Sequence, residues 1–546
     1  MKLLYSFFTT KNVTFLIFGW SVLVNVFFFP FYDVDTYHDG FIYPMALISS
    51  NGGVPNKSYF SMYGPIGPSI QGLWLQVFGE SLWILRLHGA ILILVIAWFI
   101  YRILSFKVMT TTAILLSSGW LVGNPLIVQP SLPWVDLYTS GILLIGILYI
   151  IKYKWLTNQQ LFLLGIFFSL GIFAKVNFAI PLFGILMVVI LIYGFKGGFV
   201  FSIGSLVTTL SVICTMFING NIMDYLNQGI IFPLTMHDDG KSLRGLINIK
   251  ILGFGLMLTI ILKVWQRVPQ SRKENNWFKT WLPIFLCIVA VILTFNFRKL
   301  DEPFLSLLNL NAKEGIYSLL KNLPYALMYS AIFILWIKGL KVLQSTLFST
   351  NKDPSHLILG ISICSTLQLY PNPEPAHIWY ILPVVIVGIF YNYLDKPFEE
   401  SNQEFLKKLL LIPTCLSLIT INVIYVSQER INHTVVPLRQ MKSAPDVVNS
   451  VDGTLRKLSL FTKGKSVQFN CPLGIYSVAN NIYRGSDNQY VDLIPRYGVA
   501  KTKSDLIFEC DLSKNEIEAI VSAKEVLFVS SGYGQYGDNV LYRTPK

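Results

Sequence analysis

Apolar stretches of about 20 residues recur along the first 426 residues of the chain, with short polar segments between them. A helix needs about 20 apolar residues to cross the hydrocarbon core of a bilayer. Each stretch therefore predicts a membrane span. The thirteen predicted spans cover residues 13–32, 82–103, 109–128, 134–151, 159–174, 178–195, 199–219, 251–265, 280–296, 324–338, 356–370, 378–394 and 408–426.

The pattern changes at about residue 427, where polar and apolar positions mix as in a soluble domain. "KNEIEAIVSA" has the periodicity of a helix, and "EVLFVSS" and "NVLYRT" are typical of strands. The glycine-rich "SSGYGQYGDN" follows a strand without opening a helix, which indicates a hairpin turn rather than a phosphate-binding loop. We predict a membrane domain over 1–426 and a small α/β domain over 427–546.

The first long polar segment, 33–81, contains two apolar runs that are too short or too interrupted to cross a membrane. These runs are "GFIYPMALISS" and "IGPSIQGLWLQVFG", with the turn-rich "NGGVPNKSYFSMYGP" between them. Short apolar helices of this kind lie in the membrane interface. The segment therefore predicts a structured platform on the membrane, with Asp33, Asp35 and Asp39 at its start.

Composition places the chain among integral membrane proteins. Of its 546 residues, 53% are hydrophobic and 13% are charged, whereas soluble domains carry about 25% charged residues. The net charge of +13 is spread over loops and forms no single patch, which argues against a nucleic-acid partner.

The distribution of lysine and arginine predicts the orientation. With the N-terminus inside, the inside loops carry 14 Lys and Arg in 71 residues, and the outside loops 9 in 122 residues. By the positive-inside rule, segment 33–81 and the C-terminal domain then lie outside the cytoplasm of a plasma membrane, in a cell that we expect to be bacterial. Cys471 and Cys510 of that domain are candidates for a disulfide. Four further cysteines, expected to be packing residues, lie in predicted spans: Cys214, Cys287, Cys364 and Cys415.

Several motifs of segment 33–86 resemble one enzyme group. They are Asp39-Gly40 before the first short helix, Gly52-Gly53-Val54-Pro55, Tyr63-Gly64-Pro65, and "FGESLWILR" ending in Arg86. In this respect the chain resembles the GT-C superfamily of lipid-carrier-dependent glycosyltransferases, which includes protein O-mannosyltransferases and aminoarabinose transferases. Gly40 departs from the pattern, because many relatives have Glu there. The resemblance implies a GT-C-like polytopic helical fold and a polyprenyl-phosphate-linked sugar as donor.

The chemistry of such a transfer requires a general base for the acceptor hydroxyl and cations for the departing phosphate. Asp39 is the first candidate for the base and Asp35 the second, and Arg86 is the candidate for the phosphate. In the alternative interpretation the aspartates solvate the end of a span and Arg86 anchors the next span at the interface. Tyr63 joins Arg86 as a candidate for binding substrate.

Two other outward-facing segments contain candidate substrate-binding residues. "QLYPNPEPAHIWYILP" places Glu374 and His377 in a proline-rich turn, which is otherwise an ordinary interfacial turn with an aromatic belt. "FAKVNFAIP" places Lys175 and Asn177 within apolar sequence, where a charge is often functional but a lysine can also snorkel to water.

A third outward-facing segment, "MHDDGKSLRG" at 236–245, could hold a cation at His237, Asp238 and Asp239 and a phosphate at Lys241 and Arg244. It has no complete ligand set, and we expect a solvated loop. The sequence assigns no metal ligands, and it neither requires nor excludes a divalent metal.

The resemblance thus implies an enzyme that moves a sugar, with inversion, from a polyprenyl phosphate to a hydroxyl of a glycan, lipid or protein outside the cytoplasm. A transporter or flippase of a lipid-linked glycan is the alternative, and it predicts charges within several spans and two repeated halves. We find no internal repeat in the sequence, and the acidic cluster lies at the end of a span. A non-catalytic scaffold with a sensor tail is a third interpretation.

Overall fold

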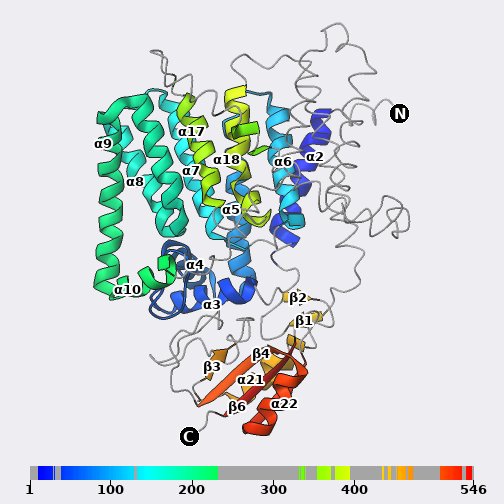
Figure 1. The fold of residues 1–546 in the computed structure, drawn as a ribbon. Coiled ribbons are helices and arrows are strands. Elements are labelled where there is room, and N and C mark those ends of the chain that lie inside the picture. The colour runs from blue at the N-terminus through cyan, green and yellow to red at the C-terminus, as the bar shows by residue number, and fades with distance from the viewer. Residues whose placement is uncertain are drawn as a thin grey trace, which may run out of the picture.

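The protein has two parts, a bundle of apolar helices and a small C-terminal sheet with two helices (Figure 1). The architecture comes from a computed structural model. It describes residues 10–28, 30, 38–127, 132–231, 331–332, 334–336, 339, 353, 355–369, 375–393, 433–435, 441–443, 450–451, 453–462, 465, 467–470, 505–531 and 537–543.

The helices of the bundle follow the predicted apolar stretches closely. They are α2 (Thr10–Leu23) with η1 (Val24–Phe28), α5 (Leu82–Leu104), α6 (Thr110–Ile127), α7 (Val135–Tyr153), α8 (Asn158–Ala174), η3 (Val176–Phe178), α9 (Ala179–Asn219), α17 (Ser355–Ser365) with η6 (Thr366–Leu369), and α18 (Pro375–Tyr393). Within the described residues, three helical stretches are long and apolar enough to cross a membrane, and four shorter apolar helices accompany them. The predicted spans 251–265, 280–296 and 408–426, and most of 324–338, lie outside the described residues, so the count of thirteen stays a prediction.

Helix α9 contains two predicted spans, 178–195 and 199–219, joined at a sharp break. Gly194 has φ 75° and ψ 178°, a conformation that a residue with a side chain rarely adopts. Beyond it, a Cβ on Gly198 would lie 2.2 Å from Cγ1 of Ile190, although residues eight positions apart in a straight helix are separated by about 12 Å. The chain therefore turns back at Gly194, and the two halves of α9 form a hairpin.

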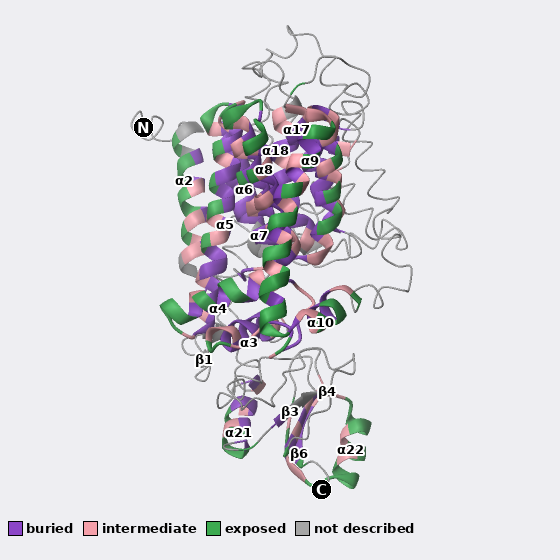
Figure 2. Cartoon of the chain, turned by 90° about the vertical axis from the view of Figure 1, so that its left-hand side faces the viewer, coloured by how far each residue is buried: buried purple, intermediate pink, exposed green. Residues whose placement is uncertain are grey.

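Between the bundle and the C-terminal sheet lies a platform of short helices, α3 (His38–Ser50), α4 (Ile66–Phe78) and α10 (Ile222–Tyr225), the last continued by η4 (Leu226–Ile231) (Figure 1). The two short helices predicted within 33–81 are thus confirmed. The outer face of α4 exposes Ile70, Leu73 and Val77, as expected for a helix that contacts lipid (Figure 2).

Hydrogen bonds join the platform to the bundle. Gln71 Nε2 of α4 donates to the Pro133 carbonyl at 2.7 Å, just before α7 begins. Trp74 Nε1 donates to the Ile84 carbonyl in the first turn of α5 at 2.9 Å. The Gly64 amide donates to the last residue of α8 at 3.2 Å. The N-terminal ends of α5 and α7 and the C-terminal end of α8 therefore meet at the platform, as the alternating direction of the predicted spans requires.

The C-terminal sheet has the strand order β3-β4-β6-β5, formed by β3 (Val467–Asn470), β4 (Leu506–Leu512), β6 (Asp538–Arg543) and β5 (Val526–Ser530). β3 and β4 are parallel, and the other neighbours are antiparallel. Helices α21 (Gly453–Phe461) and α22 (Lys514–Ala523) accompany the sheet, and β1 (His433–Val435) pairs with β2 (Met441–Ser443). The predicted helix "KNEIEAIVSA" is α22, opened by a capping box of Ser513 and Glu516.

The cysteines follow the predictions in part. Cys510 of β4 is disulfide-bonded, while Cys471, its expected partner, lies outside the described residues. Cys364 is buried in the bundle as expected. Cys214 is exposed on the outside of α9, so the packing role predicted for it is wrong. Hydropathy places a residue in a span but not on its inner or outer face.

Candidate functional site

The predicted base and the predicted phosphate ligand form one buried ion pair. Asp39 lies in the first turn of α3 and is 0% exposed, and Arg86 lies in the second turn of α5 and is 1% exposed. Arg86 Nε donates to Asp39 Oδ1 at 3.1 Å, and Arg86 Nη2 donates to Asp39 Oδ2. This is the forked arrangement in which arginine binds carboxylates most strongly.

The pair changes how both residues are interpreted. Asp39 does not solvate the end of a span, because its carboxylate is shielded from water. The guanidinium group of Arg86 donates its hydrogen bonds to a carboxylate of the protein, whereas the sequence predicts a phosphate as its partner. The catalytic role of Asp39 and the phosphate-binding role of Arg86 stay predictions, and each would require the pair to separate.

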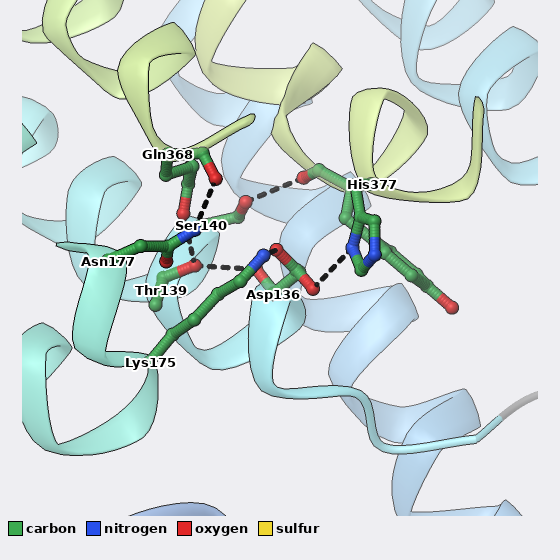
Figure 3. Close-up of polar contacts among 8 residues, drawn as sticks. Asp136, Thr139, Ser140, Lys175, Asn177, Gln368 and His377 are labelled. Carbon is green, nitrogen blue, oxygen red and sulfur yellow. Dashed lines mark hydrogen bonds and ion pairs between the residues drawn. The ribbon is translucent and has the colours of Figure 1, made fainter. Parts of the chain in front are cut away.

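A second cluster is centred on Asp136, in the first turn of α7 (Figure 3). Lys175, in the link between α8 and η3, places its Nζ 2.6 Å from Asp136 Oδ1. His377, in the first turn of α18, places its Nδ1 3.0 Å from Asp136 Oδ2. Lys175 therefore points inward to a carboxylate instead of snorkelling to water. Two predicted substrate-binding residues, 202 positions apart, meet here.

Hydrogen bonds fix the segments around this cluster. Thr139 Oγ1 donates to the Asp136 carbonyl and lies 3.0 Å from Gln368 Oε1. Asn177 Nδ2 donates to the Gln368 carbonyl at 2.7 Å. Ser140 Oγ donates to a carbonyl of α18 at 2.6 Å. Because these bonds connect α7, η3, η6 and α18, the position of the Asp136 carboxylate is set by four segments (Figure 3).

Sequence reasoning missed Asp136. The signal was present in "LPWVDLYTSG", where a single carboxylate lies in the first turn of the predicted span 134–151. An ionisable group in a span is expensive unless it is paired, and such groups are often functional. The sequence did not indicate the partners of Asp136, because Lys175 and His377 lie 39 and 241 positions away.

The remaining predicted residues divide into two sets. Tyr63 lies in the loop between α3 and α4, where its ring contacts Phe41 edge-on at 5.8 Å. The next residue, Gly64, touches the end of α8 so closely that a Cβ would lie 1.9 Å from the Phe173 oxygen. Tyr63 is thus held close to the segment that carries Lys175. Asp33, Asp35, Glu374 and the cluster at 236–245 lie outside the described residues.

A metal site is not assembled in the part of the chain that the structure describes, which brings together no group of three His, Cys, Asp or Glu side chains. The chain matches no protein-family model, no curated protein and no solved structure. The function is therefore inferred from the geometry of these two clusters and from their position at the platform.

Proposed function

We propose that the chain is a membrane glycosyltransferase of the GT-C type, which moves a sugar from a polyprenyl-phosphate carrier to an acceptor hydroxyl outside the cytoplasm. The observation that carries the proposal is the buried ionic cluster of Asp136, Lys175 and His377 at the platform end of the bundle, where the Asp39–Arg86 pair joins α3 of the platform to α5. A polyprenyl-phosphate sugar has its tail in lipid and its reacting atoms at the boundary, where these clusters lie.

The charges of the second cluster suit a departing phosphate. Asp136 is fully buried, and Lys175 alone would balance its charge. Lys175 has three donors, of which one is directed at Asp136. The others can face a phosphate oxygen on which negative charge develops as the sugar leaves, and stabilisation of developing charge is usually the largest contribution to catalysis.

The side of the membrane is supported by two independent features. The asymmetry of lysine and arginine between the loops supports a platform outside the cytoplasm. The disulfide of Cys510 is typical of an oxidising compartment, since disulfides are rare in the cytosol. Both features favour a site on the outer face of a plasma membrane.

A transporter of the same lipid-linked glycan fits less well. Transporters commonly bind their substrate near the bilayer midplane, between repeated halves. Asp136, Lys175 and His377 instead lie at helix ends on one side of the bundle. A position at one boundary favours chemistry over passage through the membrane.

The proposal is tested in proteoliposomes containing the purified protein and the total lipid extract of its native cells, with an envelope extract as acceptor. Mass spectrometry should show one polyprenyl-phosphate sugar declining while free polyprenyl phosphate rises by the same amount. If every lipid-linked sugar is unchanged, the transferase proposal is refuted. If one of them changes leaflet without being cleaved, the transporter is favoured. Surface glycans of cells with and without the gene identify the product.

A further inference from the structure

The contacts of His377 fix its ring in the tautomer and orientation that a neutral imidazole base requires. Its Nδ1 lies 3.0 Å from Asp136 Oδ2. An ionised carboxylate can only accept a hydrogen bond, so Nδ1 carries the proton, and in a neutral ring the lone pair is then on Nε2. Within the described part of the chain, Nε2 has no hydrogen-bond partner, and the side chain is 19% exposed, whereas that of Asp136 is 0% exposed.

The charges around His377 allow it to work in both protonation states. Asp136 on α7 is already neutralised by Lys175 at the end of α8. Among the described residues, the phenol of Tyr380 on α18 interacts electrostatically with Asp136 and with the phenol of Tyr63 in the platform loop. When the ring is neutral the cluster has no net charge. When the ring gains a proton, the adjacent Asp136 stabilises the imidazolium.

Asp39 is less available for the same task. Both of its carboxylate oxygens accept hydrogen bonds from Arg86, and it is 0% exposed. A base must reach the proton that it removes, within hydrogen-bonding distance or through one water. Among the described residues, His377 Nε2 has no hydrogen-bond partner to lose, whereas Asp39 must first lose Arg86.

We infer that His377 is the catalytic base of the proposed transfer and that Asp136 is a positioning residue, which fixes the tautomer and orientation of the ring. The inference depends on the proposed function. In the step, His377 Nε2 takes the proton of the acceptor hydroxyl, and the hydroxyl oxygen forms a bond to the anomeric carbon of the sugar. The bond from that carbon to the phosphate oxygen breaks, its electron pair leaves on the polyprenyl phosphate, and the imidazolium later releases its proton to water.

The test uses the proteoliposome assay with His377→Asn and His377→Ala. Asn retains a donor near the position of Nδ1, so it preserves the contact with Asp136 while removing the base. A general base contributes about 10²–10⁴ in rate, so kcat should fall at least a hundredfold, with KM for the lipid donor nearly unchanged. Added imidazole should restore part of the activity of His377→Ala. The matched control is His356→Asn in the first turn of α17, whose other end continues into η6 beside the Asp136 cluster. This variant should retain full activity.

The Asp136→Asn variant separates positioning of the base from a purely structural role. It removes the negative charge that stabilises the imidazolium formed in the step, and it no longer fixes the tautomer of the ring, because an amide group can donate as well as accept. We therefore expect kcat to fall while KM for the lipid donor stays nearly unchanged. Size-exclusion and melting profiles show whether each variant is folded, and if Asp136→Asn is not, the His377 variants still decide.

The outcomes distinguish the two proposals. If wild type does not consume any polyprenyl-phosphate sugar, the proposed function is wrong. If wild type is active and His377→Asn keeps activity within about threefold of it, or imidazole gives His377→Ala no rescue, the base is not His377 and the proposed function stands.

Discussion

The Asp39–Arg86 pair leads to a prediction that separates a structural role from a chemical one. Each side chain is the other's partner in a site that is 1% exposed or less. Removing one partner leaves an uncompensated buried charge, at a cost of about 3–5 kcal/mol, whereas replacing both by apolar residues of similar volume is often neutral or stabilising. We therefore expect Asp39→Leu and Arg86→Met each to lower the melting temperature strongly, and the double variant to lie close to wild type.

The assay is thermal stability of the purified protein, followed by size-exclusion chromatography of heated samples. The coupling energy is the difference between the effect of the double variant on stability and the summed effects of the two single variants. We expect it to offset most of the stability that the two single variants lose. Two results would contradict this reasoning: a single variant that melts like wild type, or a double variant that loses as much stability as the two single variants together. Either would mean that the buried ion pair does not stabilise the contact between α3 and α5.

The same double variant tests which carboxylate does chemistry. With His377 as the base, a stable Asp39→Leu/Arg86→Met protein should keep transfer within about tenfold of wild type. A loss of about a hundredfold or more in a protein that folds normally would return the role of base to Asp39, as the acidic motif predicts.

Three further predictions concern the scaffold. Gly64→Ala should lower the melting temperature and loosen the platform, because its Cβ would overlap an oxygen of α8, whereas Gly141→Ala in α7, with open space around it, should be neutral or slightly stabilising. Gln228→Leu should destabilise the protein by several kcal/mol at most, since three hydrogen bonds join this side chain to the loop between α3 and α4 and each unsatisfied buried group costs about 1–3 kcal/mol. In maleimide labelling without reductant, Cys510 should be protected, and Cys471→Ser should expose it; protection that persists would point to another partner.

Much of the fold was set by local sequence. The apolar length of 82–103 predicts α5 to within a residue, because crossing a bilayer depends on the number of consecutive apolar residues. The period of "KNEIEAIVSA", with Ser513 before it, defines α22 for a similarly local reason. The alternating direction of successive spans also placed Lys175 and His377 at the same end of the bundle.

The partners of the site residues were decided only by the tertiary structure. Asp39 meets Arg86 across 47 positions, and Asp136 meets His377 across 241. Hydropathy gives the length and direction of each helix, but not which helices are neighbours or how each one is rotated about its axis. Those choices depend on close packing between helices, such as the contact of Gly165 with the backbone of α9. For this reason a carboxylate that the sequence showed as one polar residue in a span became the centre of an ionic cluster.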